Sequence, residues 1–356
     1  MMILDVAKIF IPTVAAFSIG MILAPFIIDF LYAHKLWKKK SGNKGSITGG
    51  GTPIFNKLHK EKDTGTPRMG GIVVWLSVVC TVILFALIGF LFPDTLGEKL
   101  NFLSRNQTWI PFVTLIIGAL LGLVDDILVV SDKGGYVGGG LSLLKVRIPV
   151  VAAVGLLIGL WFFYKLGVDS ISIPFNGDLS LGLLFIPFFS LVMVAVFSGG
   201  VIDGLDGLSG GVFASLFFSY AIIAFFQNQI DLAAFSAVVA GATLAFLWFN
   251  IPPARFYMTE TGMIALTMCL TVVAFLTEQV AVLPIIAFPL FLSSGSVIIQ
   301  VLSKKFRNGK KVFLVAPIHH HFEALGWPSY KVTMRFWIVT IICSIFGVVI
   351  ALVGTL

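Results

Sequence analysis

The sequence predicts an all-α polytopic membrane protein with about ten transmembrane helices, one outer β-hairpin and one cytoplasmic interfacial helix. Of its 356 residues, 58% are hydrophobic and only 12% are charged, whereas charged residues make up about 25% of a soluble domain. The apolar residues gather in runs of about 20, which is the length of a membrane-spanning helix. We expect residues 1–356 to form a single transmembrane domain.

The predicted spans are apolar runs separated by short polar connections. They cover residues 9–32, 70–92, 109–129, 148–166, 181–198, 208–227, 231–249, 261–277, 280–302 and 333–355. The first run is too long for the apolar part of a secretory signal, so we expect it to remain as a helix.

Two further segments are not expected to span. Residues 169–181 alternate in polarity around Asn176 and Gly177, a pattern that predicts a β-hairpin. Residues 317–326 open with Pro317 and end at Gly326, which indicates a short helix lying along the membrane surface.

The distribution of positive charge predicts the orientation. Twenty of the 24 Lys and Arg residues lie in four connections, at 33–69, 130–147, 250–260 and 303–335. The positive-inside rule places these connections in the cytoplasm and both termini outside. The net charge of +7 is therefore explained by topology, and no nucleic-acid partner is expected.

Carboxylates gather at the cytoplasmic ends of the predicted spans. They are Asp125, Asp126, Asp203, Asp206 and Glu260. Such acids repel one another and cost desolvation energy at a bilayer boundary. A bound cation that serves a phosphorylated ligand is the simplest explanation.

Two other motifs could contact phosphate groups. Residues 65–71 are expected to start the second span with Thr66 as N-cap and Pro67 in the first turn, and nearby Lys62 and Arg68 would make an anion site. An ordinary capped helix start is the alternative. His319, His320 and His321 could donate hydrogen bonds to phosphate oxygens, or could belong to a hydrated interfacial loop.

In this order, the motifs resemble those of the phospho-N-acetylmuramoyl-pentapeptide transferases, which belong to the polyprenyl-phosphate N-acetylhexosamine-1-phosphate transferases. They are residues 65–71, Asp125-Asp126, 203–208, 250–262, 316–323 and 335–338. The chain departs from the family pattern in the second acidic motif, where residues 197–202 lack the expected asparagines. Glu260 replaces an aspartate of the family pattern, and Arg68 replaces a threonine.

The resemblance implies transfer of phospho-MurNAc-pentapeptide from UDP-MurNAc-pentapeptide to undecaprenyl phosphate, giving lipid I and UMP for peptidoglycan synthesis. It also implies Mg²⁺, contact with membrane lipid, a homodimer, and location in the bacterial inner membrane with the active site on the cytoplasmic face. The expected catalytic residues are Asp125, Asp126, Asp203 and His320. The expected substrate-binding residues are Lys62, Thr66, Asp206, Asn250, Tyr257, His319 and His321. The expected metal ligands are Asp126, Asp203 and Glu260.

Two alternatives stay open from the sequence. The chain could be a related transferase for another UDP-N-acetylhexosamine, or a weakened paralogue that binds the lipid carrier with little turnover. A secondary transporter is disfavoured, because transporter sites lie near the midplane of the bilayer, whereas these acids lie at one surface.

Overall fold

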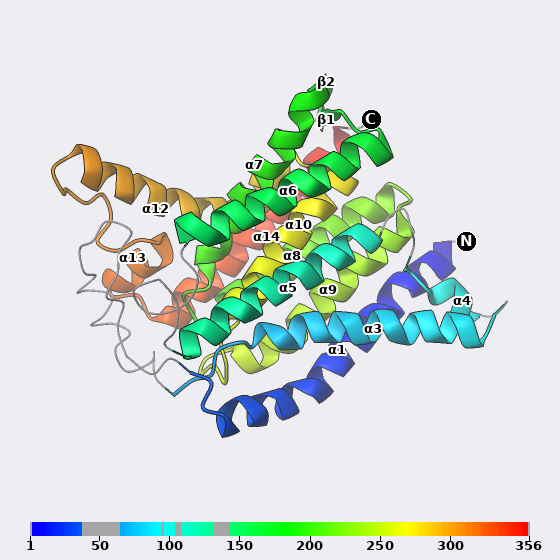
Figure 1. Ribbon diagram of the computed structural model, residues 1–356, viewed down its shortest axis with the longest axis horizontal. Coiled ribbons are helices and arrows are strands. Elements are labelled where there is room, and N and C mark those ends of the chain that lie inside the picture. Colours follow the sequence, from blue (N-terminus) through cyan, green and yellow to red (C-terminus); the bar gives the residue numbers. More distant parts are fainter. Residues whose placement is uncertain (1, 38–64, 94–95, 104–107, 132–142, 355–356) are drawn as a thin grey trace.

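The structure, a computed structural model, describes residues 2–37, 65–93, 96–103, 108–131 and 143–354. Long helices run side by side through it (Figure 1). The α-helices are α1 (Met2–Ala33), α3 (Gly71–Leu91), α4 (Leu96–Leu100), α5 (Trp109–Val130), α6 (Ile148–Trp161), α7 (Phe185–Ser198), α8 (Leu208–Phe226), α9 (Ile230–Asn250), α10 (Thr259–Leu276), α11 (Leu283–Ile286), α12 (Phe288–Phe306), α13 (Ile318–Ala324) and α14 (Ser329–Val353). Short π or 3₁₀ turns flank α6 and α7, namely η1 (Leu143–Arg147), η2 (Phe162–Leu166), η3 (Gly182–Leu184) and η4 (Gly199–Ile202).

Nine segments of the described chain are long and apolar enough to cross a membrane, which confirms the predicted all-α polytopic fold. The expected span at 280–302 differs, because the structure divides it into α11 and α12, and α12 is not among the nine. Pro284 and Pro289 each lie in the first turn of one of these helices. Proline is tolerated there but interrupts a continuous helix.

The predicted hairpin is confirmed. Strands β1 (Ser170–Ile173) and β2 (Gly177–Ser180) pair antiparallel, with Ile173 opposite Gly177. Phe175 and Gly177 adopt positive φ angles in the turn. The Phe175 N–H donates to the Gly354 carbonyl at 3.1 Å, which ties the hairpin to the C-terminal end of α14.

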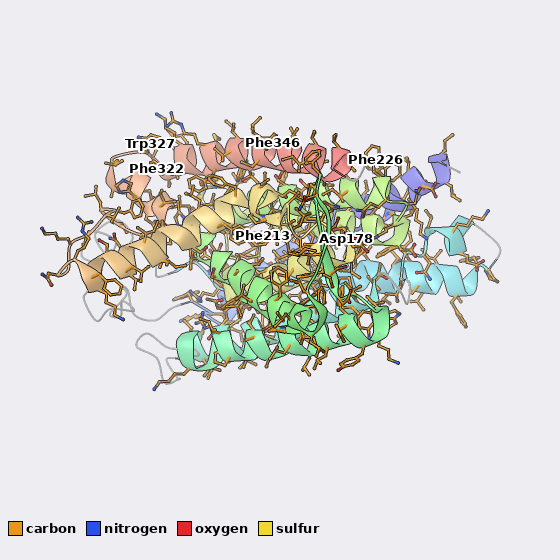
Figure 2. The ribbon with its side chains drawn as sticks, turned by 90° about the horizontal axis from the view of Figure 1, so that it is seen from above. Asp178, Phe213, Phe226, Phe322, Trp327 and Phe346 are labelled. Atoms are coloured by element: carbon orange, nitrogen blue, oxygen red, sulfur yellow. The ribbon has the colours of Figure 1, made fainter. Side chains whose placement is uncertain are left out.

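The core of the bundle is formed by α8, α9 and α10, most of whose residues are buried inside the protein. Aromatic rings fill the adjoining spaces; the rings of Phe189 and Phe275, for example, stack with centroids 4.1 Å apart. Figure 2 shows Phe213 in the middle of the bundle, and this residue is fully buried. In a lipid environment such close packing, rather than escape from water, stabilises helix association.

The two ends of the bundle differ in character. Both chain termini and the hairpin lie at one end, and α13 lies at the other (Figure 1). Figure 2 shows Phe322 and Trp327 together at the α13 end, where their rings stack at 4.9 Å. The chain termini and α13 therefore mark opposite ends of the bundle.

Candidate active site

The start of α10 joins two acidic motifs that are distant in the sequence. The Thr259 N–H donates to Asp203 Oδ2 at 2.8 Å, and the Thr261 N–H donates to Asp126 Oδ2 at 2.9 Å. The free N–H groups of a helix N-terminus are suited to binding anions. The first turn of α10 therefore fixes one carboxylate from α5 and one from the loop before α8.

This approach depends on a glycine in α5. A Cβ atom on Gly122 would collide with the backbone of Glu260 and Thr261. Without that atom, α5 lies directly against the first turn of α10, as small residues allow in membrane helix pairs. Asp125 and Asp126 lie one turn after Gly122 on α5, so this contact places them beside the start of α10.

Thr259 adopts a backbone conformation that is unusual for its residue type. Its φ angle is +54°, a region that β-branched residues rarely occupy. Its hydroxyl donates to Asp126 Oδ2 at 2.5 Å and accepts the Met69 N–H at 3.0 Å. These two contacts hold Thr259 in place, and strained residues of this kind are concentrated at functional sites.

Asp126 is the most heavily bonded of the predicted site residues. Its Oδ1 accepts from Arg68 Nε at 3.2 Å and Nη2 at 3.0 Å. Its Oδ2 accepts from the Thr259 hydroxyl, the Thr261 N–H and the Thr261 hydroxyl. The side chain is fully buried, so these donors replace the water that an ionised carboxylate would otherwise bind.

Arg147 bridges two further carboxylates. Its Nη2 lies 2.9 Å from Asp125 Oδ2, and its Nη1 forms an ion pair with Glu260 Oε1. Asp125 is fully buried, whereas the Glu260 side chain is 27% exposed. The bridge joins α5, α10 and the turn that precedes α6.

Asp203 and Asp206 belong to a braced loop. The Ser209 hydroxyl donates to Asp203 Oδ1 at 2.6 Å. Burial raises the pKa of the Asp203 carboxyl above its ordinary value, although the hydrogen bonds from Ser209 and Thr259 and the charge of Arg68 oppose the rise. Asp206 accepts the Ala254 N–H at 3.3 Å instead of capping the next helix.

Asn250 holds this loop to the 250–260 connection. Its Oδ1 accepts the Gly207 N–H at 2.9 Å, and its Nδ2 donates to the Phe256 carbonyl at 2.8 Å. The indole N–H of Trp337 donates to the Gly207 carbonyl at 3.1 Å. Both described bonds of Asn250 are to backbone groups, so its evident role is to position the loop.

The structure brings two of the three histidines to the acidic loop. A Cβ atom on Gly204 would collide with the Nε2 atoms of both His319 and His320, so a larger residue there would require both imidazoles to shift. Both imidazoles are buried, and His320 Nδ1 lies 2.7 Å from Glu323 Oε2. His321 is held elsewhere, since its Nδ1 accepts the Leu314 N–H at 3.2 Å.

The predicted phosphate motif is arranged differently from expectation. Helix α3 begins at Gly71 with Gly70 as N-cap, so Thr66 is not the cap and Pro67 is not in the first turn. Instead, the Tyr257 N–H donates to the Pro67 carbonyl, and the Gly70 N–H donates to the Tyr257 carbonyl. This backbone pairing places the Arg68 side chain beside Asp126. Lys62 lies outside the described residues.

The predicted Mg²⁺ ligands do not converge in this arrangement. Among the residues that the structure describes, no three His, Cys, Asp or Glu side chains are grouped so that they could hold a metal ion. Asp126 is occupied by five donor contacts, and Glu260 is paired with Arg147. The side chains as they lie do not fit the ion that the family resemblance implies.

Sequence reasoning missed Arg147, Thr259, Thr261 and Ser209 as parts of the site. Arg147 carried a usable signal, because it directly precedes α6 and a positive charge is unfavourable at a helix N-terminus. Such a residue needs a negative partner. The hydroxyl residues offered no comparable signal, since Thr and Ser are common at helix starts.

Similar proteins of known family identify the family of this chain. The model of the family described as glycosyl transferase family 4 matches residues 108–278. A Bacillus subtilis (strain 168) protein is 34% identical over 94% of this chain and 95% of its own length, and a Geobacillus sp. (strain WCH70) protein is 36% identical over 95% and 96%. A Listeria innocua protein is 34% identical over 95% of this chain and 96% of its own. All three are named phospho-N-acetylmuramoyl-pentapeptide-transferase, and the chain belongs to that family.

Proposed function

We infer that this protein transfers phospho-MurNAc-pentapeptide from UDP-MurNAc-pentapeptide to undecaprenyl phosphate, giving lipid I and UMP. The similarity to phospho-N-acetylmuramoyl-pentapeptide-transferases extends over at least 94% of the chain in the compared relatives. A multi-pass membrane fold suits a reaction that joins a nucleotide-linked sugar to a lipid carrier.

The observation that carries the proposal is the binding of Asp203 and Asp126 by the first turn of α10. It unites two acidic motifs, and Gly204 adds two buried imidazoles beside them. Phosphoryl transfer requires mainly positioning and stabilisation of charge. A fixed set of carboxylates, guanidinium groups and imidazoles at one end of the bundle supports both tasks.

In this proposal Asp125 orients or deprotonates the acceptor phosphate. The second pKa of a phosphomonoester is about 6, so undecaprenyl phosphate is largely dianionic at neutral pH and needs little help from a base. His319 and His320 donate hydrogen bonds to phosphate oxygens. Tyr257 and Thr66 lie on the paired segments around Arg68 and contact the nucleotide-sugar.

Mg²⁺ remains a prediction from the family resemblance. Because Asp126 and Glu260 are engaged by arginines, no catalytic step is assigned through the ion. A homodimer is likewise expected from the resemblance alone.

We place the α13 end of the molecule in the cytoplasm and both termini outside. The clustering of Lys and Arg in four connections supports this orientation. The substrate UDP-sugar would then reach the acidic cluster from the cytoplasm, while the lipid carrier arrives from the membrane.

The test is a reconstituted reaction with undecaprenyl phosphate and either UDP-MurNAc-pentapeptide or UDP-GlcNAc. We expect release of UMP and formation of a lipid-linked product with the first donor only. Comparable turnover with UDP-GlcNAc would favour a related hexosamine-phosphate transferase instead.

A weakened paralogue that binds the lipid carrier is the second candidate. The full engagement of Asp126 by five donors favours it, because a carboxylate held this tightly is less available to a substrate. Saturable binding of undecaprenyl phosphate without UMP release from either donor would support this candidate.

A further inference from the structure

Among the residues that the structure describes, two arginines contact buried carboxylates of the acidic cluster. Asp125 and Asp126 are fully buried, and each lies against a guanidinium group. A buried carboxylate without such a partner is strongly destabilising. The arginines are therefore part of the construction of the site and not incidental surface charges.

Arg68 is positioned by its own backbone as well as by Asp126. The Arg68 N–H donates to the Leu36 carbonyl at 2.9 Å, and the neighbouring Pro67 and Gly70 pair with Tyr257. Two nitrogens of the guanidinium group then donate to Asp126 Oδ1. The planar fork of arginine suits this geometry, and the group stays charged at any physiological pH.

Arg147 uses its two terminal nitrogens on two different carboxylates. One is the buried Asp125, and the other is Glu260, at the first turn of α10. The Arg147 side chain is itself only 14% exposed. One guanidinium group thus links α5, α10 and the turn that precedes α6.

We propose that Arg68 and Arg147 are the fixed counterions of this site, so that a divalent cation cannot take Asp126 as a ligand without displacing a guanidinium group and must compete with Arg147 for Glu260 Oε1. A carboxylate offers about four lone-pair sites, and Asp126 already receives five donor contacts. Mg²⁺ demands near-ideal octahedral geometry, which leaves it no room to share these oxygens.

The proposal concerns the same site as the proposed function and deepens it. It does not depend on turnover, because its consequence is a competition between guanidinium groups and a divalent cation. The two ideas can therefore fail separately. Lipid I synthesis could be absent while the competition is real, or present while the competition is not.

The experiment measures Mn²⁺ binding to the purified protein by electron paramagnetic resonance, without substrates. We expect Arg68→Gln and Arg147→Gln to bind Mn²⁺ at least about tenfold more tightly than wild type, since each removes a unit positive charge from contact with a carboxylate. Arg68→Lys and Arg147→Lys keep the charge and should stay near wild type. The matched control is Arg255→Gln, because Arg255 is exposed and lies over the Phe249 ring.

A second arm covers the case in which the glutamine variants do not fold. The double variant Arg68→Gln with Asp126→Asn removes both charges of the pair and should leave Mn²⁺ affinity within about twofold of wild type, because the net charge is unchanged and Asp126 is not available to the ion. Loss of Mn²⁺ binding in this double variant would overturn the proposal. So would glutamine variants that fold and bind Mn²⁺ no more tightly than wild type.

Discussion

Replacing Arg147 by glutamine tests how far the acidic cluster depends on this residue. The change removes the positive charge shared by Asp125 and Glu260. Removing one partner of a buried ion pair costs about 3–5 kcal/mol. Asp125 is fully buried, but Glu260 is 27% exposed and can be hydrated, so we expect about 3 kcal/mol, the lower end of that range.

The assay is thermal unfolding of the purified protein in detergent, at one fixed heating rate. We expect the midpoint of Arg147→Gln to fall by about 4 °C, because an unfolding entropy of about 2.1 cal/mol/K per residue converts about 3 kcal/mol into that shift for a chain of this length. The double variant Arg147→Gln with Asp125→Asn should recover most of that loss, because it no longer buries an unpaired charge. Arg255→Gln serves as the control and should have the same unfolding midpoint as wild type.

Either of two results would refute the reasoning. Arg147→Gln could unfold at the wild-type temperature, which would mean that the buried carboxylate does not need this partner. Alternatively, the double variant could be no more stable than the single one, which would mean that Arg147 and Asp125 are not energetically coupled.

Three further changes probe other parts of the account. Gly204→Ala should push α13 away from the acidic loop and lower turnover at least about tenfold. Gly295→Ala is the control and should not change turnover, because a Cβ atom there meets nothing within 4 Å. Equal turnover in the two variants would contradict the placement of the histidines. Thr259→Val keeps the side-chain shape but removes the hydroxyl that donates to Asp126. It should lower the free energy of unfolding by about 1–3 kcal/mol, measured by denaturant unfolding. An unchanged unfolding midpoint would show that this hydrogen bond does not stabilise the protein. A cysteine in place of Asn176, in the hairpin turn, should react with an impermeant maleimide only from the outside of intact cells, and labelling only from the cytoplasmic side would reverse the topology.

The fold was largely predictable, because spanning helices follow from apolar runs of the right length and the hairpin from a local turn signal. The division of the 280–302 span was less predictable. Pro284 and Pro289 are compatible with membrane helices in general, and only the packing around them decides whether a helix continues or breaks.

The site was predictable in part. Acids at helix ends are costly, so Asp125 and Asp203 could be recognised from sequence position alone. Their partners could not, because Arg147 lies 113 residues from Glu260 in the chain. The prediction that residues 65–71 start a helix is wrong for Thr66 and Pro67, because backbone hydrogen bonds join this segment to Tyr257. These hydrogen bonds connect segments that are distant in the sequence, so no local sequence pattern indicates them.

The measurement that tests the central claim most directly is the rate of UMP release by the reconstituted protein with UDP-MurNAc-pentapeptide and undecaprenyl phosphate. We predict that wild type releases UMP in step with lipid I, and that Asp203→Asn lowers this rate at least about a hundredfold, as loss of one preorganised charge contact can. Asp178→Asn, at an exposed acid of the hairpin, should keep the wild-type rate. Wild-type protein that releases no UMP, or an Asp203→Asn variant as fast as Asp178→Asn, would contradict the account.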